Sequence, residues 1–321
     1  MGENLLQIKN LSVDFNVGDG MLSAVHDLSF DIDRGSVYAL VGESGCGKTT
    51  SAYSVMRLLD ESTAAVSGKI LFKDNDLLKL NSRSMEDVRG REIGMIFQNP
   101  LDSLNPVYRS GFQVAEAIMI DKIGRQKAWE RVIDLYRQVQ IPDSRRRAQS
   151  FPHELSGGMR QRVMIAMMLS RRPELLICDE PTTALDVTIE AQILDIIKDL
   201  KSGFNTAFLM ITHNFGIVAE IADRIGVMYA GELVEEGDVF TVFDNPTHPY
   251  TKALLRALPR QSKKQGLLKT IEGVVPRILG SFQGCRFENR CVHARELCRQ
   301  SAPSLRQLEQ GHFIRCHGEV E

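Results

Sequence analysis

The sequence of 321 residues contains no long apolar run. No stretch approaches the roughly 18 uninterrupted apolar residues that a membrane-spanning helix requires. Charge of one sign is not in excess either, because 39 basic residues face 41 acidic ones, and this balance does not favour a nucleic-acid-binding protein. The start of the chain, residues 1–6, lacks the basic region and apolar stretch of a secretion signal. These absences predict a cytosolic protein in which any transport role requires separate membrane subunits.

The most informative segment is the run GESGCGKT at residues 42–49, which follows the apolar residues 37–41. The spacing G-x-x-x-x-G-K-[ST] between a strand and a helix predicts a phosphate-binding loop whose backbone N–H groups and helix N-terminus hold a nucleotide triphosphate. Lys48 adds a positive charge, and the Thr49 hydroxyl is a predicted Mg²⁺ ligand. The predicted nucleotide contacts are Gly42, Ser44, Gly45, Cys46, Gly47, Lys48, Thr49 and Thr50. Cys46 lies beside Lys48 and a helix N-terminus, so we expect a lowered thiol pKa and inactivation by alkylation.

Hydrophobic periodicity predicts an α/β core. The predicted strands cover residues 6–15, 28–32, 69–72, 175–178 and 207–211, and the predicted helices cover 49–59, 187–201 and much of 100–170. The first two strands have the alternation of an antiparallel pair, whereas the last two are short apolar runs typical of buried parallel strands.

An acidic pair, Asp179 and Glu180, follows the apolar strand at 175–178. Adjacent carboxylates at the end of a buried strand can divide the work of phosphate hydrolysis. Asp179 is predicted to hold Mg²⁺, directly or through water, and Glu180 to act as the general base for the attacking water. The alternative is a solvent-exposed acidic turn.

The segment LSGGMRQR at residues 155–162 distinguishes among nucleotide-hydrolysing families. Ser156 is predicted to cap an apolar helix, and two glycines leave its N-terminus open to an anion. With this segment, the first 245 residues resemble the ATP-binding cassette (ABC) family, in which the signature completes the nucleotide site of a facing subunit. The resemblance implies a P-loop NTPase core of the ABC ATPase type, with antiparallel β and helical subdomains, that binds ATP and Mg²⁺.

The same resemblance assigns further residues. It implies that Phe15 stacks on adenine, that Gln98 contacts Mg²⁺ and couples the core to the helical subdomain, and that His213 contacts the γ-phosphate. Asp186 is expected near the dimer interface, and Ser156 and Gly158 are expected to contact the nucleotide held by the partner. Two residues depart from the family pattern: Met159 stands where Gln is common and is not expected to abolish binding, and Asn214 stands where Asp is common, next to His213.

Residues 245–255, NPTHPYTKALL, are similar to the segment that marks the ATPases of oligopeptide and dipeptide importers. Its Ala253, Leu254, Leu255 and Leu258 are expected to dock on the main domain. We therefore predict an ABC nucleotide-binding domain at 1–245, with a helical subdomain at about 100–170, and a C-terminal extension at 246–321.

Four of the six cysteines lie in this extension, with the spacing C-x5-C-x6-C-x17-C. Disulfides are disfavoured in a reducing cytosol, and the C-x2-C pairs common in zinc sites are absent. The alternatives are a [4Fe–4S] cluster, which the resemblance to this importer branch favours, a zinc ion, or free thiols. The predicted ligands are Cys285, Cys291, Cys298 and Cys316.

The predicted function is therefore the ATP-hydrolysing subunit of a dipeptide or oligopeptide importer at the cytoplasmic face of the membrane. The implied partners are two integral membrane permeases, a second ABC ATPase and, indirectly, an extracytoplasmic peptide-binding protein, with no nucleic acid. The alternative is a soluble cassette ATPase of iron–sulfur assembly, DNA maintenance or translation. The single cassette and the lack of a long heptad insertion argue against several of these.

Overall fold

A computed structural model describes residues 3–98, 104–181, 187–257 and 271–318. Contacts within the chain divide it into two compact units. Unit 1 contains Asp33–Ser36 and Leu80–Met210 together with the start of the chain, and unit 2 contains Asn4–Ile32, Val37–Lys79 and the chain from Ile211 onward. Among the described residues, no helix has the length and apolar character needed to cross a membrane.

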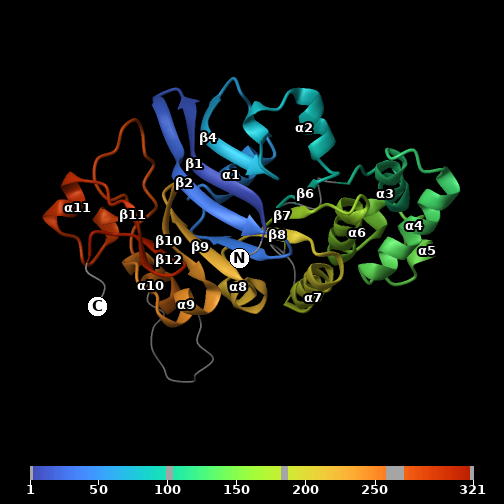
Figure 1. Ribbon diagram of the computed structural model, residues 1–321. Coiled ribbons are helices and arrows are strands. Elements are labelled where there is room, and N and C mark those ends of the chain that lie inside the picture. Colours follow the sequence, from blue (N-terminus) through green and yellow to red (C-terminus); the bar gives the residue numbers. More distant parts are fainter. Residues whose placement is uncertain (1–2, 99–103, 182–186, 258–270, 319–321) are drawn as a thin grey trace. The chain divides into compact units, whose positions relative to one another are not determined.

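Unit 2 contains an antiparallel sheet with the strand order β2-β1-β4-β5; β1, β2 and β4 are labelled in Figure 1. Its strands are β1 (Asn4–Val17), β2 (Gly20–Asp33), β4 (Ala64–Phe72) and β5 (Asn75–Asp76). The predicted strands at 6–15 and 28–32 are thereby confirmed. In β1 the alternating apolar residues Leu6 and Ile8 are followed by Leu11 and Val13, with the parity changed from even to odd, and all four are at most 1% exposed. The register with β4 shifts here, with Asn10 at φ 50°, and such a β-bulge brings all four side chains to one face.

Unit 2 also carries the ladder β3-β9-β10-β12-β11. In this ladder β9 (Arg224–Tyr229) runs parallel to β3 (Val37–Val41), whereas β10 (Glu232–Asp238), β12 (His312–Arg315) and β11 (Leu305–Glu309) are joined by antiparallel pairing. The helices of the unit are α1 (Lys48–Val55), α8 (Phe215–Ile221), α9 (Val239–Asp244), α10 (Pro249–Arg256) and α11 (Glu296–Gln300). The C-terminal hairpin β11–β12 thus extends the sheet that contains β3. The predicted domain boundary at 245 stays a prediction.

In unit 1, β7 (Leu175–Asp179) lies between β8 (Ala207–Thr212) and β6 (Ile93–Ile96), and β6 runs parallel to β7. The helices are α2 (Ser82–Val88), α3 (Ser110–Met119), α4 (Arg125–Gln138), α5 (Ser144–Arg147), α6 (Gly157–Leu169) and α7 (Val187–Phe204). Helices α3, α4 and α6 pack against one another (Figure 1). The predicted strands at 175–178 and 207–211 and the helical character of 100–170 are confirmed, whereas the four-residue strand β6 was not predicted from the sequence.

Two predicted helices differ in detail from the observed ones. Helix α1 ends at Val55, because Arg57 takes a left-handed conformation, φ 48°, that stops the helix before residue 59. In α10 the buried residues are Tyr250 and Thr251, and residues 253–255 are half-buried, so their docking on the main domain stays a prediction. Leu258 lies outside the described residues.

Candidate functional site

The phosphate-binding loop lies between β3, which ends at Val41, and α1, which begins at Lys48. Gly42 and Gly47 have positive φ angles of 151° and 103°, and a Cβ atom would come within 2.3 Å of the Met228 carbonyl oxygen or 2.5 Å of the Ala24 carbonyl oxygen. Glycine is therefore required at both positions by conformation and by space. No side chain caps the start of α1, so the first turn of this helix presents its N–H groups to an anion.

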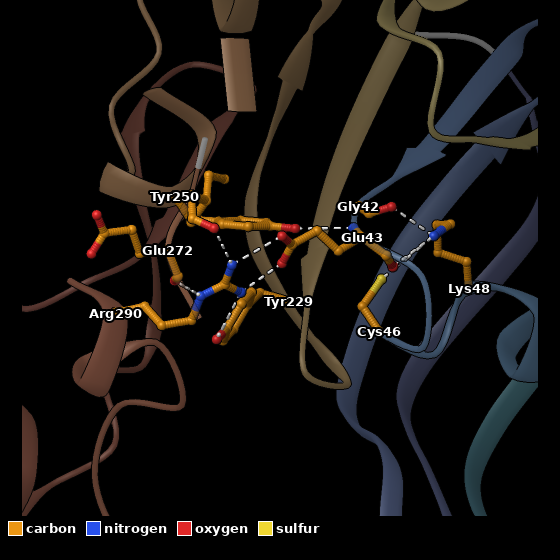
Figure 2. Close-up of polar contacts among 9 residues, drawn as sticks. Gly42, Glu43, Cys46, Lys48, Tyr229, Tyr250, Glu272 and Arg290 are labelled. Atoms are coloured by element: carbon orange, nitrogen blue, oxygen red, sulfur yellow. Dashed lines mark hydrogen bonds and ion pairs between the residues drawn. The ribbon is translucent and has the colours of Figure 1, made fainter. Parts of the chain in front are cut away.

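Lys48 is 5% exposed, and its ammonium group lies within the loop (Figure 2). The Nζ atom donates to the carbonyl oxygens of Gly42 at 2.7 Å and Glu43 at 3.0 Å. Ser44 and Gly45 at the tip are exposed, while Thr49 and Thr50 on the first turn of α1 are half-buried. The loop thus combines a fixed cation, exposed backbone at the tip and hydroxyl groups at the helix start.

Cys46 does not have the reactive character expected from its neighbours. Its side chain is completely buried, and burial raises the pKa of the thiol. Lys48, whose Nζ is 3.7 Å from the sulfur, acts in the opposite direction but does not outweigh desolvation. The expected lowering of the pKa was therefore wrong, because the sequence shows the adjacent charge but not the burial.

In unit 1, the structure brings two of the predicted catalytic side chains together. Asp179 is fully buried at the end of β7, and Glu180 follows in a left-handed conformation with φ 48°. A residue with a side chain at positive φ stores backbone strain, which is common where a side chain must be aimed. Gln98, just after β6, donates from Nε2 to Oε2 of Glu180 at 3.0 Å. The ends of two adjacent parallel strands therefore place an amide and a carboxylate in contact.

The signature segment begins α6 as predicted. The Ser156 hydroxyl accepts a hydrogen bond from the N–H of Met159 at 3.3 Å, which confirms it as the helix N-cap. A Cβ atom at Gly158 would lie 2.8 Å from Cγ2 of Ile189 in α7, so this glycine permits close helix packing, whereas Gly157 has open space around it. The buried Gln161 donates to the carbonyl oxygen of Pro181 at 2.8 Å and so ties α6 to the residue after Glu180.

For the remaining predicted nucleotide contacts, the structure gives the position and exposure of some side chains but does not test their roles. Phe15 on β1 is half-buried and His213 after β8 is exposed. The side chain of Asn214 accepts from the N–H of Gly216 at 2.9 Å and caps α8, a role that Asp could also fill. Asp186 lies outside the described residues. The roles assigned to all of these residues stay predictions.

The four C-terminal cysteines line one cavity of about 350 Å³. Cys285, Cys291, Cys298 and Cys316 are all half-buried free thiols, and the Cys285 N–H donates to the Cys298 carbonyl oxygen at 2.7 Å. Burial raises the pKa of Cys285 to about 12. Within the described part of the chain, no group of three or more His, Cys, Asp or Glu side chains is placed to hold a single metal ion.

One further residue at the phosphate-binding loop could not be predicted from the sequence. Arg290, the residue before Cys291, contacts Glu43 of the phosphate-binding loop. The two positions are 247 residues apart, and a single arginine in a short polar segment has no pattern that predicts a distant partner.

Residues 25–183 match the protein family described as ABC transporter, and residues 234–298 match the family described as oligopeptide/dipeptide transporter, C-terminal region. The sequence is 47% identical over 315 residues to the probable peptide ABC transporter ATP-binding protein y4tR of Sinorhizobium fredii, which covers 97% of this chain and 94% of that protein. It is 44% identical over 314 residues to the dipeptide transport ATP-binding protein DppD of Escherichia coli, over 98% of this chain and 96% of that protein. The fold is similar to that of the dimeric ATP-binding cassette MJ0796 bound to ADP and phosphate, with a TM-score of 0.66 and 23% identity over 73% of this chain and 98% of that one.

Proposed function

The chain belongs to the ABC transporter family of ATPases, and from this premise we propose that it is the ATP-hydrolysing subunit that energises import of dipeptides or oligopeptides. The observation that carries the catalytic part is the contact between Gln98 and Glu180 at the ends of adjacent parallel strands. The peptide assignment is supported by the C-terminal region at 234–298 and by the names of the relatives. A soluble cassette ATPase is not favoured by these relatives.

The residues divide the chemistry of hydrolysis. The backbone of residues 42–49 and the Lys48 ammonium bind the phosphates, and Glu180 accepts a proton from the attacking water while Gln98 orients its carboxylate. Thr49 carries a hydroxyl oxygen, Gln98 an amide oxygen and Asp179 a carboxylate, the kinds of group that would hold Mg²⁺, and the ion when bound would neutralise phosphate charge. His213 contacts the γ-phosphate, and Phe15 offers an aromatic face to the base. Ser156, Gly158 and Asp186 serve the nucleotide of a second ATPase.

Replacement of Glu180 by Gln tests this assignment, because an amide keeps the shape of the side chain but cannot take up the proton. We expect a loss of ATP turnover of at least about 100-fold with retained ATP binding. Phosphate release and equilibrium ATP binding are measured side by side. Glu220→Gln, a change of an exposed carboxylate in α8, provides the matched control. Normal hydrolysis by the Glu180 variant would refute Glu180 as the base.

The proposed partners are two membrane permeases, a second ATPase that is either this chain or a related one, and an extracytoplasmic peptide-binding protein that acts through the permeases. The protein would then lie at the cytoplasmic face of the membrane. Affinity purification from native membranes tests this part of the proposal. Recovery with integral membrane proteins supports it, whereas recovery in a complex that contains only soluble proteins refutes it.

We also propose that the four C-terminal cysteines hold a [4Fe–4S] cluster. The support is that all four thiols line one cavity, and thiolates are the usual ligands of such clusters. When bound, the cluster would cross-link a segment with little core of its own. Anaerobic purification should yield about four iron and four sulfide per chain. Both should be lost in the Cys291→Ser/Cys298→Ser variant and kept in Cys178→Ala, which changes a β7 residue. Zinc, or no metal, in the wild-type protein would refute the cluster.

A further inference from the structure

The segment between the first two C-terminal cysteines reaches the phosphate-binding loop. Arg290 forms a two-point ion pair with Glu43, with Nη1 2.6 Å from Oε2 and Nη2 3.0 Å from Oε1 (Figure 2). The Arg290 side chain is 4% exposed and the Glu43 side chain 29%. A bidentate pair with one buried partner fixes both distance and orientation, which a single surface contact does not.

The other donors of Arg290 are also engaged, so the guanidinium is held in one place. Nε donates to the Glu272 carbonyl oxygen at 2.9 Å, and Nη2 donates to the Ile271 carbonyl oxygen at 3.3 Å. The guanidinium carbon lies 5.6 Å from the ring centre of Tyr229. The Arg290 side chain therefore links the C-terminal segment to Glu43 in one fixed orientation.

A second contact from the same region holds the backbone of Glu43. The Glu43 N–H donates to the Tyr250 hydroxyl at 3.0 Å. Tyr250 is fully buried, and its ring lies 4.7 Å from that of Tyr229 and 5.3 Å from that of Phe287. Phe287 lies between Cys285 and Arg290 in the chain, so one aromatic cluster connects the cysteine segment to both contacts.

These contacts bear directly on the phosphate-binding lysine. The carbonyl oxygens that hold the Lys48 ammonium belong to Gly42 and Glu43, so a shift of Glu43 moves both acceptors. In addition, the Glu43 carboxylate would repel a bound triphosphate if Arg290 did not neutralise it. The C-terminal segment thus controls the shape and the charge of the loop.

We propose that Arg290 is a positioning residue of the nucleotide site and that, with Tyr250, it couples the four-cysteine segment to ATP binding. Order in this segment raises affinity for ATP, and by linkage bound ATP orders the segment to the same degree. The proposal rests on the assignment of residues 42–49 as the nucleotide site. It does not depend on which group, if any, the cysteines hold.

The test compares equilibrium binding of a fluorescent ATP analogue and steady-state ATP hydrolysis in purified full-length variants. Arg290→Met removes the ion pair with Glu43, and Tyr250→Phe removes only the hydroxyl that accepts a hydrogen bond from the Glu43 N–H. Arg299→Met is the matched control, because Arg299 pairs with Glu288 at 2.8 Å in the same segment without reaching the loop. Thermal midpoints are recorded for each variant.

We expect Arg290→Met to weaken ATP binding about fivefold or more, and to raise KM while kcat changes little. Adding Glu43→Gln should restore part of the affinity, since it removes the unpaired carboxylate, and Arg290→Lys should bind better than Arg290→Met. Tyr250→Phe should shift affinity in the same direction as Arg290→Met, and Arg299→Met should not. Wild-type affinity in both the Arg290→Met and Tyr250→Phe proteins would overturn the inference, whereas a wild-type chain that fails to bind ATP would overturn the proposed function instead.

Discussion

The side chain of Glu235 in β10 holds the backbone segment that precedes α10, and a substitution at this position tests that role. Its side chain is fully buried, and its carboxylate accepts from the backbone N–H groups of Thr247 at 2.7 Å and His248 at 2.9 Å. The Nε2 atom of His312 lies 2.9 Å from the same oxygen that Thr247 contacts. One carboxylate therefore fixes the residues before α10 and links them to β12. We predict that Glu235→Gln opens this segment locally.

The expected size of the effect follows from the donors. An amide has one acceptor oxygen, so at least one buried N–H loses its partner, at a cost of about 1–3 kcal/mol. That cost corresponds to a local opening equilibrium roughly 5-fold to 150-fold higher. Hydrogen exchange of a peptide that covers residues 245–252 should be faster by this factor. ATP affinity should also fall, because α10 carries Tyr250.

The control is Glu309→Gln, an exposed carboxylate in β11 of the same unit. Its exchange at residues 245–252 should equal that of the wild type. If Glu235→Gln also left this exchange unchanged, the carboxylate would not be what holds the segment, and the reasoning from unsatisfied donors would be wrong.

Two further predictions concern pH and packing. Burial lowers the pKa of His248 in the folded protein to about 3, whereas in the unfolded chain its pKa is about 6.5. Between these two pH values the His248 imidazole is protonated only in the unfolded chain. The contribution of His248 to the free energy of unfolding is therefore complete above about pH 6.5 and decreases at lower pH, by about 1.4 kcal/mol between pH 7.5 and 5.5. Urea midpoints should show this loss in the wild type but not in His248→Asn. Gly158→Ala should lower the free energy of unfolding by about 1–3 kcal/mol, because the new Cβ atom would clash with the Ile189 side chain. Gly157→Ala should not, because no atom lies within 4 Å of a Cβ at that position. Equal thermal midpoints for the two variants would contradict this prediction.

Local patterns predicted much of the fold and the nucleotide loop because their determinants lie close together in the chain. The loop needs Gly42 and Gly47 at fixed spacing, and the acidic pair needs only an apolar strand before it. The bulge at Asn10 is harder to predict, because its only sign in the sequence is that the alternating apolar residues change from even-numbered to odd-numbered positions. Strand β6 is four residues long with a glycine inside, which is too short for a periodicity to stand out.

Burial and long-range contacts account for what the sequence did not predict. Cys46 has a neighbouring lysine in sequence, but its pKa depends on the atoms that exclude water around it, and these come from distant segments. Strand β12 of the C-terminal hairpin pairs with β10 through residues as far apart in the chain as Glu235 and Ile314, so the place of the hairpin in the sheet is a property of topology. Arg290 combines both cases: its charge is visible in the sequence, but its partner and its burial are not. A residue of this kind is found by asking what holds each part of a recognised motif, since a phosphate-binding loop keeps its shape through contacts that the motif itself does not contain.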